Sequence, residues 1–349
     1  MHTLLGYGQA VRLQTLTLAL QGSNPCTPAI FILRPFKRSF LLNILIKKDS
    51  FLIDEACYNE AMSFTPSTWI DYEVIDVGEG EKLERYGSFI IRRPDSNALS
   101  YVADTKSGLW KQSDATFRQG NQNGEWIKKK TVPEAWTISI DDLSFKIALT
   151  PFKHTGIFPE QATNWEWMRK LIKESKRDIK VLNLFAYTGA ATMACAKEGA
   201  SVVHVDASKG SVLWAKENAV LCGLETAPIR YLVDDVLKFV QREIRRGNTY
   251  DAIIMDPPAF GRGPKGELWR FNDQLKQLMG LCQQLLSEKP LFVCVSTYND
   301  AFDLNDLKHL IHDHFPLEIA DCECAELILR ISNKNIPLEC GNSARVRFK

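Results

Sequence analysis

The sequence lacks the cysteine patterns of metal-binding and disulfide-rich proteins. Its nine cysteines include no Cys-x-x-Cys pair and no Cys/His cluster at zinc spacing, and an odd number suits no complete set of disulfides. The close pair Cys322 and Cys324 falls in a strand-like segment, where a structural role fits better than a metal or redox role. We therefore expect reduced thiols, no metal and a cytoplasmic location.

Strong net charge and long apolar runs are also missing. A net charge of +1 provides no global basic field, so any contact with nucleic acid must come from local patches. The apolar run Ser39–Ile46 is too short to span a membrane and is followed by two lysines. The 349 residues suffice for one large domain or two ordinary ones, with the composition of a soluble globular protein.

Acidic residues are absent from the first 48 positions, which contain only basic charges. Such a composition resembles an organelle transit peptide. An alternative origin is a start assigned too far upstream, because Gly22–Cys26 (GSNPC) is the translation of GGTTCGAATCCCTGT, which resembles the T-arm of a transfer-RNA gene. On that alternative the native chain starts at Met62, and residues 1–61 form an extension that is disordered or not native.

Residues 62–150 show short alternating runs separated by turn residues, which predicts a small antiparallel β domain. Aromatic and basic residues interleave here and could stack on and neutralise an RNA strand. A place in the hydrophobic core is the alternative for the aromatic side chains. The aromatic residues are Trp69, Tyr72, Tyr86, Phe89, Tyr101, Trp110, Trp126 and Trp136, and the basic ones are Arg92, Arg93, Lys128, Lys129 and Lys130.

Residues 151–349 alternate apolar strands with helices of 10 to 15 residues. This order predicts an α/β fold, a doubly wound Rossmann-like sheet that ends in antiparallel strands. We expect strands at 181–187, 201–207, 229–235, 250–258, 290–297, 325–333 and 343–349, and helices at 190–199, 209–223, 236–247, 267–286 and 303–315.

The loop after the first of these strands, Phe185–Gly189, lies where such folds bind a cofactor. Its single glycine does not match the G-x-G-x-x-G pattern that a dinucleotide needs. Asp206 ends the second strand, where a carboxylate can accept from both ribose hydroxyls, and Asp234 and Asp235 end the third, where one can accept the adenine amine. Either of the last two could instead only cap the following helix. Together these residues favour S-adenosylmethionine over NAD.

Asp256 ends a strand without polar alternation, and two prolines follow it. The rigid prolines predict that the Asp256 carboxylate and the Pro257 carbonyl are placed to accept from an exocyclic amine, with Phe260 stacking on the ring. A proline turn that merely covers the crevice is the structural alternative. Basic residues on the same loop could hold phosphates or be solvated: Arg262, Lys265 and Arg270.

The motifs NLFAYTG, VDASKGSVLWAKENA, DDVLKF and MDPPAF, preceded by HTGIFPEQ, resemble the bacterial class I S-adenosylmethionine-dependent methyltransferases of large-subunit ribosomal RNA, in the branch of cytosine-C5 and guanine-N7 enzymes. The resemblance implies RNA as substrate and Asp256–Phe260, including Pro258, as the catalytic segment. It implies a cofactor site made of Phe158, Gln161, Phe185, Ala186, Tyr187, Thr188, Gly189, Asp206, Ala207, Asp234, Asp235 and Asp256.

One feature departs from the cytosine-C5 enzymes, which carry a nucleophilic cysteine after the fifth strand. The equivalent segment, Val295–Asp300, has none, and Cys294 precedes it inside the apolar strand. We therefore expect direct attack on the methyl group by a base nitrogen, with His154 and Tyr298 as candidate general bases. A protein or small-molecule methyltransferase and a non-catalytic RNA-binding assembly factor remain the alternatives.

Overall fold

The structure, a computed structural model, describes residues 46–47, 50–51, 63–67, 69–120, 124–129, 132–299, 301–315 and 319–349. The chain divides into two units, Met1–Cys57 and Tyr58–Lys349. In the first unit, β1 (Ile46–Lys47) pairs antiparallel with β2 (Ser50–Phe51). The expectations for residues 1–61, including the start at Met62, otherwise fall outside the described residues. The description below concerns the second unit.

A parallel sheet forms in the second half of the chain because its strands are apolar on both faces. The hydrogen-bonded order is β13-β12-β11-β14-β17, followed by the antiparallel β19 and β18. This confirms the doubly wound α/β sheet with antiparallel strands at its C-terminal end. The strands are β11 (Lys180–Leu184), β12 (Ser201–Asp206), β13 (Ile229–Val233), β14 (Ala252–Met255), β17 (Phe292–Thr297), β18 (Ile319–Ile331) and β19 (Ile336–Phe348).

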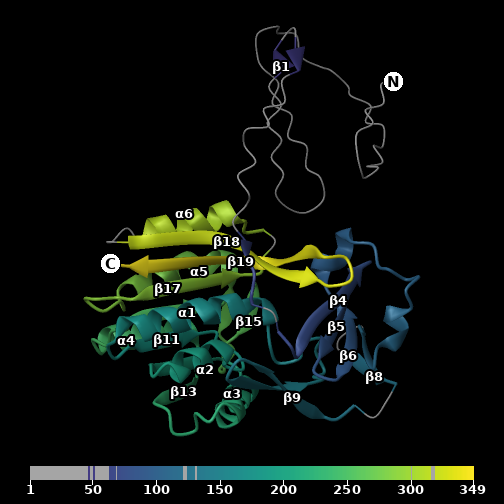
Figure 1. The fold of residues 1–349 in the computed structure, drawn as a ribbon. Coiled ribbons are helices and arrows are strands. Elements are labelled where there is room, and N and C mark those ends of the chain that lie inside the picture. The colour runs from purple at the N-terminus through teal and green to yellow at the C-terminus, as the bar shows by residue number, and fades with distance from the viewer. Residues whose placement is uncertain are drawn as a thin grey trace. The chain divides into compact units, whose positions relative to one another are not determined.

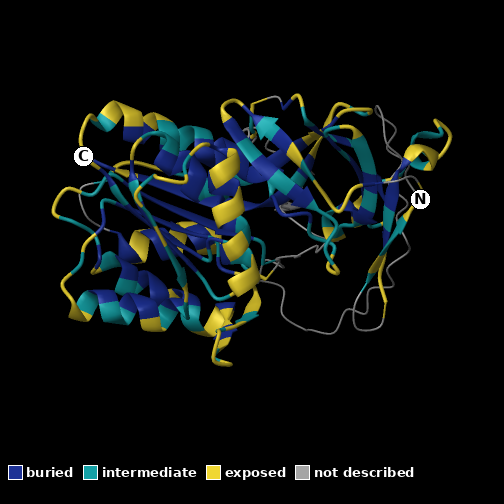
Figure 2. Ribbon diagram, turned by 90° about the horizontal axis from the view of Figure 1, so that it is seen from below, coloured by how far each residue is buried: buried dark blue, intermediate teal, exposed yellow. Residues whose placement is uncertain are grey.

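Helices cover both faces of this sheet. Successive strand residues point to opposite faces, so Val181 packs with α1 and α2, whereas Leu182 packs with α4, α5 and α6. Figure 2 shows the strands buried and the outward helix faces exposed. Among the described residues, no helix is long and apolar enough to cross a membrane. The helices are α1 (Ala162–Ser175), α2 (Ala190–Lys197), α3 (Lys209–Leu221), α4 (Val236–Arg245), α5 (Phe271–Gln283) and α6 (Leu304–His314).

The region before residue 150 is built of short strands, as expected. Strands β4, β5 and β6 pair antiparallel, β7 joins β6 in parallel, and β8 closes the row. A separate hairpin of β9 and β10 packs against α3. The elements are β3 (Ser63–Phe64), β4 (Tyr72–Gly78), β5 (Glu81–Tyr86), β6 (Phe89–Pro94), η2 (Ser96–Ser100), η3 (Leu109–Gln112), β7 (Ala115–Arg118), β8 (Glu125–Lys128), β9 (Ala135–Ile140), β10 (Leu143–Ala148) and η4 (Pro159–Gln161).

The aromatic side chains of this region divide between core and partly exposed positions. Trp69, Tyr72 and Tyr86 are buried in the hydrophobic core, with Tyr72 and Tyr86 edge to face at 4.9 Å. This placement favours the core alternative over RNA stacking for these three. The other aromatic residues of the set are half-buried, and Lys130 lies outside the described residues.

A long C-terminal hairpin, β18–β19, connects the two regions (Figure 1). Its strands continue well beyond the expected segments, and Ile331 of β18 pairs with Val74 of β4. Side chains of the β region bond to the hairpin: Asn97 Nδ2 donates to Cys340 O at 3.1 Å and Tyr101 Oη to Pro337 O at 2.8 Å. One hydrogen-bonded sheet therefore runs through both regions, and the boundary at residue 150 stays a prediction.

The structure corrects the expected helix over 267–286. Residues Leu268–Arg270 form β16, which pairs with β15 (Phe260–Arg262), and α5 begins only at Phe271. Arg270 has an extended backbone with φ −128°, so the helix cannot start before it. The chain after the two prolines thus folds back as a hairpin. Helix α1 is not among the helices expected from the sequence.

Candidate active site

A cavity of about 640 Å³ opens at the carboxyl ends of the parallel strands. Its volume lies in the range of small-molecule sites. The sheet contributes one wall, with Asp206, Asp235 and Asp256, and we call these residues the sheet wall. The β region contributes the opposite wall through β5, β6 and the start of η2, and residues 153–160 lie between them.

The three aspartates converge because β13, β12, β11 and β14 are neighbours that run in the same direction. Asp206 is the last residue of β12, Asp235 is the second residue after β13, and Asp256 directly follows β14. Parallel strands place their carboxyl ends at one edge, where such folds bind ligands. Residues far apart in the sequence therefore share this edge.

Backbone amides fix the Asp206 carboxylate. Tyr187 N donates to Oδ2 and Ser208 N to Oδ1, each at 2.8 Å. Burial raises the pKa of Asp206, and these two bonds oppose the shift. Each carboxylate oxygen can accept a second hydrogen bond. Asp206 can therefore hold two hydroxyls of a ligand without changing its orientation.

The loop Phe185–Gly189 adopts a constrained backbone. Phe185 and Tyr187 have φ of 54° and 50°, a left-handed conformation that bulky residues rarely adopt. Such backbone costs about 1–3 kcal/mol per residue and persists where the surroundings impose it. Here the bond from Tyr187 N to Asp206 and that from Ala186 N to Val205 O hold the loop. Phe185 and Tyr187 consequently line the cavity.

The structure separates the two candidate aspartates after β13. Asp235 lines the cavity and also caps α4 by accepting from Lys238 N at 2.9 Å. Asp234 is outside the cavity lining, where it pairs with Arg242 and accepts from Asp235 N. Only Asp235 is therefore positioned to meet a ligand in the cavity.

Asp256 faces the cavity beside a second acid, Glu160. Among the described residues, no hydrogen bond or ion pair engages the Asp256 carboxylate, and Glu160 is 5% exposed. Burial, together with the neighbouring charge of Glu160, raises the pKa of Asp256 to about 8. Burial likewise raises the pKa of Glu160. Two carboxyl groups in one apolar recess attract hydrogen-bond donors and positive charge.

The loop after Asp256 is stiffened by more than its prolines. Trp269 Nε1 of β16 donates to Pro258 O at 2.7 Å, and the Trp269 ring lies 4.8 Å from that of Phe185. Pro257 and Pro258 line the cavity. Phe260 does not, and its side chain is 56% exposed. The structure thus brings Asp256 and the prolines to the site but leaves Phe260 outside the cavity lining.

Comparison with known proteins identifies the family that uses this arrangement. Residues 102–307, more than half of the chain, match the family described as S-adenosylmethionine-dependent methyltransferase. The chain belongs to this family. Its cofactor is S-adenosylmethionine, a nucleoside whose ribose hydroxyls suit the oriented Asp206 carboxylate.

Two curated relatives share part of this methyltransferase. The ribosomal RNA large subunit methyltransferase K/L of Shewanella frigidimarina is 34% identical over 145 residues, 41% of this chain and 20% of the relative. The ribosomal RNA large subunit methyltransferase K of Neisseria meningitidis is 31% identical over 197 residues, 54% of each. The chain therefore spans between about a fifth and about half of the length of these relatives.

A solved structure matches over a larger share. The crystal structure of the SAM-dependent methyltransferase from Agrobacterium tumefaciens has a TM-score of 0.79 and 38% identity. It covers 82% of this chain, and the chain covers 94% of it. The similarity includes the β region as well as the parallel sheet, because 82% of the chain exceeds the length of residues 151–349.

A smaller cavity of about 60 Å³ adjoins the loop Phe185–Gly189. The candidate residues Gln161, Ala186, Thr188 and Gly189 line it, while Phe158 lines both cavities and Ala207 the larger one. Gly189 has φ +84°, and a Cβ there would lie 3.0 Å from Ala215 Cβ. The tight turn into α2 therefore requires glycine.

Neither candidate general base readily accepts a proton: His154 is a weak base, and Tyr298 keeps its own proton. Burial and the charges of Arg93 and Lys153 lower the pKa of His154 to about 4, so its imidazole is neutral. Burial and the acids Glu160 and Asp256 raise the pKa of Tyr298. Its hydroxyl accepts from Gln161 Nε2 at 2.8 Å, which orients the ring at the cavity.

Two buried cysteines lie near the site, and both are thiols. Burial raises the pKa of Cys294, inside β17, to about 11. Cys340 of β19 also lines the cavity, although no motif in the sequence pointed to it. Burial and Glu160 raise its pKa too, and its Sγ donates to Leu338 O at 3.4 Å. Neither cysteine has the lowered pKa of an activated nucleophile.

Sequence reasoning missed several residues of the cavity. Glu160 lies inside the quoted motif HTGIFPEQ but was not selected, and Lys82 and Asp95 belong to the β region. Arg93 was noted only as a partner for RNA stacking. In the sequence, Glu160 is marked only by its position as a single acid directly after Pro159. Among the described residues, no three His, Cys, Asp or Glu side chains gather as they would around a metal ion.

Proposed function

We propose that this methyltransferase transfers a methyl group from S-adenosylmethionine to a base nitrogen of RNA, with large-subunit ribosomal RNA as the substrate class. One observation carries the proposal: the Asp256 carboxylate, which forms no ion pair with the described residues, faces a cavity that Arg93 and Lys153 also line. A base that bears an amine suits the acid, and a nucleotide chain suits the cations. The names of the curated relatives support RNA as the substrate.

The cofactor supplies an electrophilic methyl group on a positively charged sulfur. Asp206 would hold its ribose, Asp235 would accept its adenine amine, and the loop Phe185–Gly189 would surround its methionine end. The positive sulfur would lie near Glu160 and Asp256, and this charge would favour their ionised forms.

The chain would act on the target base by positioning it. Asp256 and the Pro257 carbonyl would accept from an exocyclic amine, and the bond from Trp269 to Pro258 keeps that loop in place. A rigid recess cannot reach a stacked base, so the target must be unpaired or flipped. Positioning of this kind supplies much of the rate of a displacement reaction.

Proton removal requires no dedicated base when the acceptor is a ring nitrogen with a free lone pair. This agrees with the neutral His154 and the protonated Tyr298. A covalent cytosine-C5 route would need a thiolate, and the pKa values of Cys294 and Cys340 are raised. We therefore favour guanine or another base with a nucleophilic nitrogen, and we expect the enzyme to work in the cytoplasm.

The test is transfer of tritiated methyl groups to ribosomal RNA taken from a strain in which the gene is deleted. We expect label in a single nucleoside of the large-subunit RNA, identified by mass spectrometry after digestion. The matched control is Asp256→Asn, which keeps the shape of the side chain but loses its charge and one acceptor. Label in protein or in small molecules instead would overturn the RNA substrate. Cofactor binding with no transfer to any acceptor would favour the assembly factor.

A further inference from the structure

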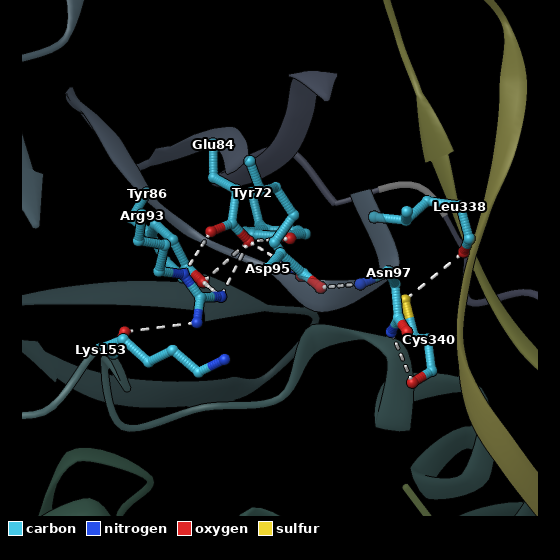
Figure 3. Close-up of polar contacts among 10 residues, drawn as sticks. Tyr72, Glu84, Tyr86, Arg93, Asp95, Asn97, Lys153, Leu338 and Cys340 are labelled. Carbon is cyan, nitrogen blue, oxygen red and sulfur yellow. Dashed lines mark hydrogen bonds and ion pairs between the residues drawn. The ribbon is translucent and has the colours of Figure 1, made fainter. Parts of the chain in front are cut away.

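A buried charge cluster underlies the β-region wall of the cavity (Figure 3). Glu84 is its centre and is fully buried. Its carboxylate accepts from Arg93 Nε at 2.6 Å and Nη2 at 3.1 Å, and from Tyr72 Oη at 2.6 Å. Burial would favour the neutral acid, but Arg93 and Lys82 lower the pKa of Glu84 to about 2.

Lys82 and Asp95 complete this cluster. Lys82 Nζ lies 3.2 Å from Glu84 Oε1 and 3.0 Å from Asp95 Oδ2. Asp95 Oδ1 also accepts from Asn97 N at 2.9 Å. Both carboxylates and the Lys82 ammonium are therefore engaged within the cluster.

Two hydrogen-bond donors, one N–H of Arg93 and the Lys153 ammonium, have no acceptor among the residues that the structure describes. Bonds to Glu84, to Tyr86 Oη and to the Lys153 carbonyl use four of the five N–H donors of Arg93. The Lys153 ammonium forms no hydrogen bond or ion pair with the residues that the structure describes. In Figure 3 only the Lys153 carbonyl is joined to Arg93, and no dashed line reaches the ammonium.

The surroundings of Lys153 are positively charged. Burial opposes its charged form, Asp95 favours it, and Arg93 and Lys82 oppose it, so that its pKa is lowered. Lys153 and Arg93 both line the cavity. A half-buried cation held beside two other cations is stabilised by an anion that enters the cavity.

We propose that Lys153 and the remaining N–H of Arg93 bind a phosphate of the substrate nucleotide. This inference rests on RNA being the substrate. A phosphodiester brings one negative charge and oxygens that accept from both donors. The cofactor's carboxylate is a weaker candidate, because its methionine end is assigned to the loop Phe185–Gly189 on the sheet wall.

The test compares Lys153→Gln and Lys153→Arg with the wild type and with Lys173→Gln, which changes an exposed lysine of α1. The probe is a fluorescein-labelled single-stranded RNA of ten nucleotides and mixed sequence, followed by anisotropy across a range of salt concentrations. S-adenosylhomocysteine and 5′-methylthioadenosine, which lacks the amino-acid carboxylate, are titrated by calorimetry.

We expect Lys153→Gln to weaken RNA binding about tenfold, since a charged hydrogen bond is lost. The slope of log K against log salt should fall by about 1. Lys153→Arg should keep most of the affinity, and Lys173→Gln should behave as the wild type. Binding of S-adenosylhomocysteine should change less than about twofold in all variants, which shows that the sheet wall is intact.

Three results would overturn the proposal. Unchanged RNA binding by Lys153→Gln would remove the phosphate site but leave RNA as the substrate. Weaker binding of S-adenosylhomocysteine, with 5′-methylthioadenosine unaffected, would assign the ammonium to the cofactor carboxylate. A wild type that binds S-adenosylhomocysteine but no RNA would overturn the RNA substrate itself.

Discussion

The cavity and the charge cluster behind its β-region wall contain the same kinds of acid in opposite states. At the cavity, Asp256 and Glu160 form no ion pair with the residues that the structure describes, and burial raises their pKa values. In the β region, Glu84 is fully buried and Asp95 is partly buried, but Lys82 and Arg93 lower the pKa of each to about 2. Burial alone therefore does not decide ionisation. Acids that form no ion pair are available to a ligand, whereas acids in ion pairs hold the structure together.

The largest effect is expected from removing the paired acid at the centre of the cluster. Glu84→Gln removes the carboxylate that balances the buried charges of Arg93 and Lys82. We therefore expect the free energy of unfolding to fall by about 3–5 kcal/mol. Urea denaturation at pH 7 measures it. The control is Glu81→Gln, whose partner Arg92 is partly exposed, and it should cost less than about 1 kcal/mol.

The paired state of Glu84 also predicts a pH dependence. Its folded pKa lies below its usual value of 4.5, so its contribution to stability is present above pH 4.5 and is lost as the pH falls toward 2. Glu84→Gln should remove this part of the acid transition. Equal losses from Glu84→Gln and Glu81→Gln would contradict a central role for Glu84.

A ligand-facing acid should affect binding more than stability. Asp206→Ala removes two charge-assisted bonds of about 1.5–3 kcal/mol each, so we expect S-adenosylhomocysteine to bind at least about a hundredfold more weakly. Calorimetry measures the dissociation constant. Asp234→Ala is the matched control, because Asp234 lies outside the cavity lining and pairs with Arg242; it should change affinity less than about threefold. Comparable losses in both variants would contradict the separation of the two sites.

The unpaired state of Asp256 predicts a pH effect of opposite sign. Its folded pKa of about 8 exceeds its usual value of 3.8, so the folded protein holds a proton that the unfolded chain releases. Stability from this group is present below pH 4 and is lost as the pH rises to 8. Asp256→Asn should therefore gain stability over the wild type across this window, by one to a few kcal/mol, since one pKa unit is about 1.4 kcal/mol.

Thermal unfolding at pH 5, 6.5 and 8 measures the Asp256 effect. Asp251→Asn is the control of opposite sign. Burial opposes the charge of Asp251, but bonds from Lys180 N, Ser287 and Arg177 lower its pKa, so its variant should lose stability at pH 8. An Asp256→Asn variant less stable than the wild type at pH 8 would refute an unpaired carboxylate.

The smallest effect is expected at Phe260. Its side chain is exposed outside the cavity lining, so Phe260→Ala should leave S-adenosylhomocysteine affinity unchanged and reduce methyl transfer less than about threefold. Initial rates of transfer measure this. Stacking on a base is worth about 1–3 kcal/mol, so a tenfold or larger loss would restore the stacking role that the sequence suggested.

Local patterns in the sequence were sufficient for much of the fold. Apolar runs without polar alternation predicted β11, β12, β14 and β17, because such runs are buried on both faces. They were insufficient between Phe260 and Phe271, where pairing of β15 with β16 delayed the start of α5. Helical propensity at Leu268–Arg270 was overridden by that tertiary pairing.

Local residues suffice to place Asp206, Asp235 and Asp256 at strand ends, because a strand end depends on its own residues and on the turn that follows. The choice of Asp235 over Asp234 at the cavity was visible only in the folded chain, where Asp234 pairs with Arg242 outside the cavity lining. The tertiary structure alone also brought Lys82, Arg93 and Cys340 to the same cavity. Lys82 and Arg93 are paired across the β5–β6 hairpin, but their proximity to Cys340 and to the sheet wall depends on long-range pairing through β18 and β19, which no local pattern encodes.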